Sequence, residues 1–302
     1  MRMPRRRPSP AARVVMRSLA ARGRRYASRT DEQLLEDARR AHAEAAPEPR
    51  FPAPGAVVRR DEGLTAGAGF PVFAATPAAA AADGPRVLYL HGGAYTNDFA
   101  RWHWRLIGRL AADAGATVYA PQYPLAPERT WRDSFPQLVA MAEALDVQVL
   151  SGDSAGGGYA LAIAQALAAR GASPTVALLS PWADLTLSLA ETEPYASRER
   201  WLTMNRLRVA AAAWAGGDEL ARRELSPLFG DFAGIRRMLV VAGTGERLYS
   251  EAAAVVDRAG AAGVPAELLV GELMPHVYPL LPIPEARPAL AALVRVVRSA
   301  GR

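Results

Sequence analysis

The chain of 302 residues contains no cysteine and no lysine, and all 36 of its basic residues are arginines. The absence of cysteine excludes disulfide bonds, a thiolate metal site and a cysteine nucleophile. The absence of lysine, beside abundant alanine, indicates a compositional bias and predicts no function. No apolar run approaches the roughly 20 residues that a membrane-spanning helix needs, so we expect no stable membrane insertion.

Excess positive charge is confined to the start of the chain. The first 25 residues hold nine arginines and no acid, and the remainder carries 27 basic and 30 acidic residues. This balance gives no reason to expect nucleic acid as a partner. Arg13 and Arg17 interrupt each apolar stretch that could form a secretory signal, and we expect a cytoplasmic protein. Residues 1–26 are predicted to be a disordered extension, with a basic amphipathic helix on an anionic surface as the alternative.

Short apolar runs alternate with amphipathic stretches after residue 86. This alternation predicts a mainly parallel sheet with helices on both faces, in one α/β domain over residues 27–302. The strands are expected at Val87–Leu90, Thr117–Ala120, Val147–Leu150, Val176–Leu179, Met238–Ala242 and Leu268–Val270. The helices between them are expected near Trp104–Ala114, Phe135–Leu145, Tyr159–Ala169, Tyr249–Ala259 and Ala286–Val297. A helix at Asp31–Ala43 and strands at Ala56–Arg60 and Phe70–Ala75 are expected to precede them.

A tight turn rich in glycine follows the strand Val147–Leu150. Gly152-Asp153-Ser154-Ala155-Gly156 leads from this strand into a helix, and strand, G-x-S-x-G and helix together are typical of a nucleophile elbow. Such a turn raises the serine at the carboxyl edge of the sheet, beside the free N–H groups of a helix N-terminus. Ser154 is therefore the candidate nucleophile, and a plain Gly/Ser turn is the alternative for the motif alone.

Two adjacent glycines follow the strand that ends at Leu90, within His91-Gly92-Gly93-Ala94-Tyr95. Glycines let the backbone approach a ligand closely, as is needed where a tetrahedral oxyanion forms during acyl transfer. The N–H groups of Gly92 and Gly93, with that of Ala155, are predicted to form an oxyanion hole. By itself the pair would favour an ordinary turn.

A serine nucleophile needs a base, and the chain has four histidines. His276 follows the last expected strand, which is the position of a late triad histidine, and the order of serine, acid and histidine agrees with this assignment. His42 and His103 lie in expected helices, and His91 is expected to brace its loop by hydrogen bonding.

Two carboxylates compete for the role of triad acid. Glu246 is the first carboxylate after the strand Met238–Ala242, where it could hold the imidazole tautomer of His276 and stabilise the imidazolium. Asp184 follows the preceding strand. We predict Glu246 as the acid and a loop-bracing role for Asp184, and Asp184 stays open as the alternative triad acid.

These motifs, in this order, resemble the hormone-sensitive-lipase-like branch of the α/β-hydrolase carboxylesterases. The matching stretches are YLHGGAY (89–95), YPLAPE (123–128), GDSAGGG (152–158), SPWADLTLS (180–188), SPLFGD (226–231) and PHVYPLLP (275–282). The resemblance implies a small helical cap over the site, formed here by residues of about 27–50 and 186–222. Two positions depart from the family pattern, because Ala94 replaces a third glycine and Glu246 replaces an aspartate.

The sequence therefore predicts a serine hydrolase that cleaves small or medium carboxylic esters through an acyl-enzyme, without metal or cofactor. Ser154 is expected to attack, His276 to transfer protons and Glu246 to orient the histidine. An acyltransferase or amidase with the same triad is one alternative, and a non-catalytic ligand-binding receptor on the same fold is another. The expected partner is a small-molecule ester, and a homodimer stays open.

Overall fold

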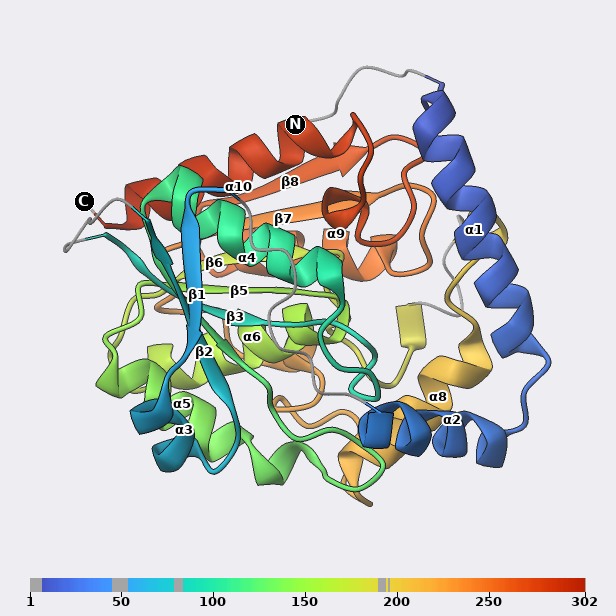
Figure 1. Cartoon of the computed structure of the whole chain (residues 1–302), viewed down its shortest axis with the longest axis horizontal. Helices are drawn as coiled ribbons and strands as arrows, with labels where there is room; N and C mark the ends of the chain where they lie inside the picture. The colour runs from blue at the N-terminus through green and yellow to red at the C-terminus, as the bar shows by residue number, and fades with distance from the viewer. Residues whose placement is uncertain (1–6, 45–53, 79–83, 190–193, 195, 302) are drawn as a thin grey trace.

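A computed structural model of the chain describes residues 7–44, 54–78, 84–189, 194 and 196–301. Within these residues, eight strands form one sheet in the order β1-β2-β4-β3-β5-β6-β7-β8 (Figure 1). β2 runs antiparallel to its neighbours β1 and β4, and the other neighbouring pairs are parallel. The strands are β1 (Ala56–Arg60), β2 (Val72–Pro77), β3 (Arg86–Leu90), β4 (Thr117–Pro121), β5 (Val149–Asp153), β6 (Thr175–Leu179), β7 (Arg237–Gly243) and β8 (Ala266–Gly271). The predicted α/β-hydrolase sheet is confirmed.

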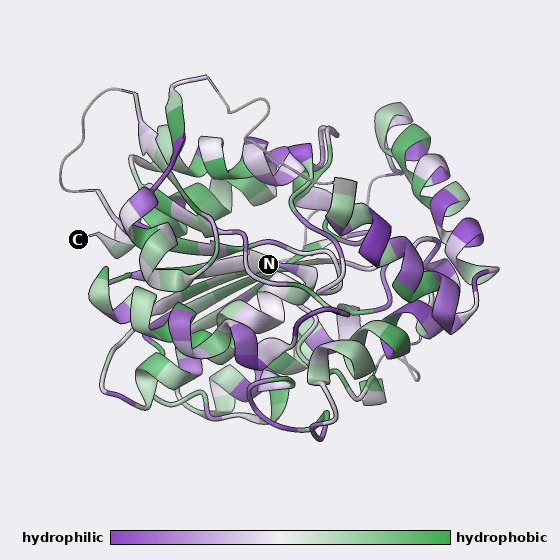
Figure 2. Ribbon diagram, turned by 60° about the horizontal axis from the view of Figure 1, so that its bottom comes forward, coloured by the Kyte–Doolittle hydropathy of each residue, from purple (hydrophilic) through white to green (hydrophobic). Residues whose placement is uncertain are grey.

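Helices cover both faces of the sheet (Figure 1). α4 (Arg101–Ala114) and α10 (Ala286–Ala300) lie on one face, and α3 (Glu62–Ala68), α5 (Phe135–Ala144), α6 (Ser154–Ala168) and α9 (Tyr249–Ala261) lie on the other. Successive strand residues point to opposite faces, so Leu88 and Leu90 join one core while Val87 and Tyr89 join the other. Both faces of the central strands are therefore apolar, and Figure 2 shows these strands in green between helices of mixed colour.

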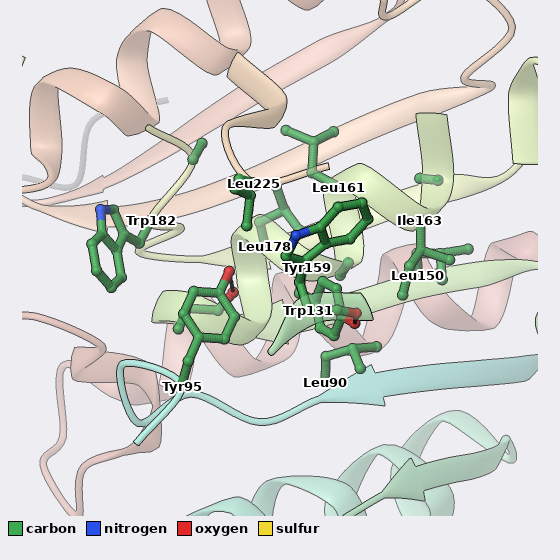
Figure 3. Close-up of a cluster of buried hydrophobic side chains, with 14 of the residues drawn as sticks. Leu90, Tyr95, Trp131, Leu150, Tyr159, Leu161, Ile163, Leu178, Trp182 and Leu225 are labelled. Carbon is green, nitrogen blue, oxygen red and sulfur yellow. Dashed lines mark hydrogen bonds between the residues drawn. The ribbon is translucent and has the colours of Figure 1, made fainter. Parts of the chain in front are cut away.

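One of the two cores continues beyond the carboxyl edge of the sheet as a cluster of aromatic rings. Figure 3 shows Tyr95, Tyr159 and Trp182 packed among leucines of the neighbouring elements. The ring of Tyr95 stacks on that of Trp214, with centroids 4.5 Å apart and planes 3° from parallel. This cluster fixes the loop after β3 to the helix that carries Trp214.

Three helices gather beyond the carboxyl ends of the strands: α1 (Pro10–Ala27), α2 (Asp31–Glu44) and α8 (Met204–Ala215) (Figure 1). α2 and α8 fall in the two segments predicted to form a cap, and they contact one another. Parts of those segments, residues 45–50, 190–193 and 195, lie outside the described residues. In the described part of the chain, no helix is both long and apolar enough to span a bilayer.

The prediction of a disordered extension over residues 1–26 is wrong from Pro10 onward, where α1 begins; residues 1–6 lie outside the described residues. Ser9 caps this helix by accepting a hydrogen bond from the Ala12 N–H at 3.1 Å, and it donates two hydrogen bonds to Glu285. Ala12 and Leu19 are buried against the core under α4 and α10. The arginines of α1 obscure this apolar stripe in the sequence. In the structure, the stripe packs the helix against the core.

Candidate active site

β5 passes into α6 through the turn that carries Ser154. Ser154 adopts a φ of +53°, the left-handed region that non-glycine residues rarely enter. A Cβ atom at Gly152 would lie 2.3 Å from the Gly156 carbonyl oxygen, and one at Gly156 would lie 2.2 Å from the Leu90 carbonyl oxygen. Both glycines are thus required by close backbone contacts, and the backbone strain at Ser154 is held by the packed strand and helix on either side.

The structure brings Ser154, His276 and Glu246 together in one hydrogen-bonded chain. His276 Nε2 lies 2.8 Å from Ser154 Oγ, and His276 Nδ1 lies 2.5 Å from Glu246 Oε2. Glu246 lies in the loop after β7, and His276 lies in the loop after β8. The histidine and the glutamate are buried, and Ser154 keeps a small exposed fraction of 9%. This arrangement can pass a proton from the serine hydroxyl to the imidazole.

Glu246 is held in place through its second oxygen. Its Oε1 accepts hydrogen bonds from Ser180 Oγ at 2.8 Å and from the Gly243 N–H at 2.7 Å, which leaves Oε2 directed at His276. Ser180 Oγ also accepts a hydrogen bond from the Val277 N–H, next to the histidine. Burial tends to lower the pKa of His276, but the adjacent Glu246 carboxylate outweighs it and raises that pKa above the usual value.

Asp184, the competing carboxylate, has a different set of partners. Its two oxygens accept hydrogen bonds from the backbone and hydroxyl groups of Thr186 and Ser188. These bonds close a local turn after β6, in agreement with a loop-bracing role. The structure therefore does not bring Asp184 into the hydrogen-bonded chain of Ser154.

The predicted contribution of Gly92 to an oxyanion hole is wrong. Its N–H donates to Asp153 Oδ1 at 3.0 Å and is therefore already used within the protein. The N–H groups of Gly93 and Ala94 have no acceptor among the described residues, and Ala155 is the second residue of α6, where N–H groups lack helical partners. Ala94 has a φ of +56°, which suits the glycine of the family pattern. Gly93, Ala94 and Ala155 are the candidate donors.

Asp153 is a functional candidate that the sequence pattern did not reveal. Besides the Gly92 N–H, its Oδ1 accepts the Tyr89 hydroxyl at 2.6 Å, and its Oδ2 lies 3.3 Å from His103 Nε2. Burial tends to raise the pKa of Asp153, but His103 and the two hydrogen bonds on Oδ1 lower it, so the side chain stays ionised. The carboxylate therefore ties the loop after β3 to the serine turn.

The other histidines lie around this loop. His91 is buried, its ring stacks on that of Tyr123, and its Nδ1 lies 2.8 Å from the Gly92 carbonyl oxygen, which agrees with the expected bracing role. His42, in α2, places its ring nitrogens 2.9 Å from Glu128 Oε2 and 3.0 Å from the Thr96 carbonyl oxygen. It therefore links α2 to the loop after β3.

A cavity of about 560 Å³ opens above Ser154, between the sheet and the helices α1, α2 and α8. Its floor includes Gly93, Ala94, Ser154 and His276, and its walls include leucines of α2 and α8 and arginines of α1, α2 and α8. Among the described residues, no group of three or more histidine, aspartate or glutamate side chains is placed to hold a metal ion.

Comparison with known proteins identifies the family. A family described as having the α/β-hydrolase fold matches residues 87–280. An acetyl-hydrolase of Streptomyces hygroscopicus is 34% identical over 231 residues, covering 72% of this chain and 77% of that protein. LipR of Mycobacterium tuberculosis is 36% identical over 177 residues, and the chain spans 57% of its length.

Solved structures agree with the sequence comparison. The crystal structure of an esterase from the bacterial hormone-sensitive lipase family has a TM-score of 0.80 and 28% identity, over 98% of this chain and 100% of that one. The resemblance seen in the sequence motifs is confirmed. The chain belongs to the α/β-hydrolase family, in its hormone-sensitive-lipase-like branch.

Proposed function

We propose that this protein is a carboxylesterase in which Ser154, His276 and Glu246 form the catalytic triad. The observation that carries the proposal is the continuous hydrogen-bonded chain from Ser154 Oγ through both ring nitrogens of His276 to Glu246. An assembled nucleophile, base and acid beside a cavity also favour an enzyme over a receptor that only binds.

In the first half of the proposed reaction, the ester acylates the serine. Ser154 Oγ attacks the acyl carbon of the ester while its proton moves to His276 Nε2, and the carbonyl oxygen becomes an oxyanion. The N–H groups of Gly93, Ala94 and Ala155 hold that oxyanion at the positive end of α6. The bond between the acyl carbon and the alcohol oxygen then breaks, and the leaving alcohol takes the proton from Nε2.

The second half repeats these steps with water. His276 Nε2 takes a proton from a water molecule as the water oxygen attacks the acyl carbon of the acyl-enzyme. The bond to Ser154 Oγ breaks, the serine regains its proton from Nε2, and the carboxylic acid leaves. One ester and one water thus give one acid and one alcohol. Throughout, the Glu246 carboxylate stabilises the imidazolium form of His276.

A cavity of about 560 Å³ with leucine-rich walls suits an ester of small or medium size. The acetyl-hydrolase name of the Streptomyces relative supports a short acyl group. A panel of p-nitrophenyl esters of graded acyl length tests the function. We expect release of p-nitrophenol to be fastest with short acyl groups.

The matched variant for this panel is Ser154→Ala. It removes only the hydroxyl oxygen, so the packing around the residue should change little. We expect it to lose at least about 10⁴-fold in kcat while keeping its melting temperature within a few degrees. A folded Ser154→Ala protein with full esterase activity would refute the proposed nucleophile. A wild-type protein that is inactive on the whole panel would refute the proposed function.

A further inference from the structure

The cavity above Ser154 contains an arginine without a counter-ion. Arg206 lies in the first turn of α8 and lines the cavity, and its guanidinium lies 4.1 Å above the ring centroid of Tyr26. Within the described residues, no carboxylate lies within ion-pair distance of this guanidinium. Tyr26, from α1, offers the electron-rich face of its ring but no net charge.

The acidic residues of the cavity are already paired with other groups. Asp37, in α2, lies 3.2 Å from Arg29 and 3.6 Å from Arg40. At the floor of the cavity, Asp153 lies 3.3 Å from His103. Asp98, also near the floor, accepts hydrogen bonds from the Phe99 N–H and the Gln122 side chain. None of these carboxylates is placed to neutralise the arginine of α8.

The surroundings add positive rather than negative potential at Arg206. The first turn of α8 contains no acidic side chain, and its helix N-terminus carries partial positive charge. Arg22 and Arg25, in α1, line the same cavity and make no ion pair with any described residue. The part of the cavity lined by these arginines is therefore a region of positive potential, and the apolar side chains of Leu202 and Leu207 line the same cavity.

A partly buried guanidinium without a counter-ion is costly, because it has lost water without gaining a negative partner. Burial accordingly lowers the pKa of Arg206 below its usual value, although the residue stays charged at neutral pH. The Tyr26 ring supports one side of the guanidinium, and no described residue accepts a hydrogen bond from its N–H groups. An arginine fixed in this way matches the two oxygens of a carboxylate.

We propose that Arg206 binds a carboxylate on the substrate, so that the enzyme prefers esters that carry an anionic group at the end of a short apolar chain. The inference rests on the proposed esterase function and adds its substrate class. The ester bond would lie at Ser154, the apolar chain along the leucines, and the carboxylate at Arg206. Arg206 thereby determines specificity without taking part in the chemical steps.

Matched substrates test this preference. On the acyl side, the monoethyl esters of glutarate, adipate and pimelate are compared with ethyl pentanoate, hexanoate and heptanoate. On the alcohol side, O-acetyl-4-hydroxybutanoate is compared with butyl acetate. Acid release is followed in a pH-stat. For at least one chain length on one side, we expect kcat/KM for the anionic ester to exceed that for its neutral partner.

Three variants distinguish a specific contact between Arg206 and the substrate carboxylate from a general effect of positive charge near the site. Arg206→Gln removes the charge and is expected to reduce the ratio of anionic to neutral kcat/KM by on the order of 10- to 100-fold, mainly through KM. Arg206→Lys keeps the charge but not the planar fork, and it should retain part of the preference. Arg208→Gln removes an exposed charge from the same helix, outside the cavity, and should leave the ratio unchanged.

Inhibition gives a readout that requires no turnover of an anionic ester. Adipate is expected to inhibit hydrolysis of a neutral ester competitively in the wild type and much more weakly in Arg206→Gln. The inference is overturned if neutral esters are hydrolysed but no anionic ester is preferred on either side. It is equally overturned if Arg206→Gln and Arg208→Gln change the ratio alike. Failure on both the neutral and the anionic esters would instead refute the esterase function itself.

Discussion

The hydroxyl group of Tyr95 donates a hydrogen bond to the backbone carbonyl of Ala155 at 2.9 Å. Tyr95 follows Ala94 in the chain, so this bond joins the two segments that supply the candidate oxyanion donors. The ring of Tyr95 is buried and stacks on Trp214 of α8. One side chain therefore fixes the distance between the two halves of the oxyanion hole and connects them to the cap.

Replacing Tyr95 by phenylalanine should disturb catalysis more than binding. The Tyr95→Phe variant keeps the ring stack but leaves the buried carbonyl of Ala155 without its donor, so we expect kcat to fall about tenfold with little change in KM. Tyr159→Phe is the control, because it removes a hydroxyl of the same cluster that contacts Ser134 instead. Loss of stability alone in both variants, with kcat unchanged, would contradict a positioning role for Tyr95.

The acid of the triad is tested by a pair of isosteric substitutions. Glu246→Gln keeps the shape but leaves the imidazolium of His276 unsupported, so kcat should fall by on the order of 10²–10⁴-fold while KM changes little. Asp184→Asn weakens a local turn and should lower the melting temperature with little effect on kcat. An Asp184→Asn protein that lost turnover without loss of stability, beside an active Glu246→Gln, would reverse the assignment.

The pH dependence of activity follows from the raised pKa of His276. The serine mechanism needs a neutral imidazole, so kcat/KM should rise with pH as His276 loses its proton, with a midpoint above the usual value of 6.5. In Glu246→Gln the carboxylate that favours the imidazolium is gone, and the midpoint of the remaining activity should move to lower pH. An unchanged midpoint in that variant would argue against the pairing.

A second buried carboxyl group should affect stability rather than catalysis. Glu251 is fully buried, and its Oε2 accepts the N–H groups of Ala183 and Asp184. Burial and the nearby Asp184 carboxylate raise the pKa of Glu251 well above its usual value, so the native state keeps the proton. The unfolded chain releases that proton near pH 4.5, so the stabilisation present below this pH is lost as pH rises towards the native pKa.

Glu251→Gln cannot titrate, so it should lose less stability than the wild type between pH 5 and pH 8. The difference between the two proteins should change by up to about 1.4 kcal/mol per pH unit. Free energies of unfolding from urea titrations at both pH values measure it. Glu267→Gln, at an exposed position of β8, should show no such change. If the free energy of unfolding changed equally with pH in the wild type and in Glu251→Gln, a raised pKa at Glu251 would be excluded.

The sequence predicted the sheet well because its strands are buried on both faces and therefore apolar throughout. The expected strand Val176–Leu179 lies within β6, and the helix expected at Phe135–Leu145 ends one residue beyond α5. The candidate site residues Ser154, His276 and Glu246 could also be predicted from the sequence, because each follows a strand at the carboxyl edge of the sheet. These positions can be read from the order of short motifs along the chain.

Contacts between distant segments could not be predicted in the same way. The bond from the Gly92 N–H to Asp153 joins residues 61 positions apart, and no local pattern shows that this N–H is already used. The stack of Arg206 on Tyr26 joins α8 to α1, a helix whose many arginines concealed its buried stripe. Both features depend on how the cap and the loops pack in three dimensions.

The most direct test of the account is covalent labelling of the nucleophile. A p-nitrophenyl ester of a small alkylphosphonate should react with Ser154 Oγ, releasing one p-nitrophenol per chain and forming a stable phosphonyl-serine. Mass spectrometry of the digested protein should place one adduct on Ser154, in parallel with the loss of esterase activity. Ser154→Ala should remain unlabelled. Inactivation with the adduct on another residue, or full labelling with activity intact, would contradict Ser154 as the catalytic nucleophile.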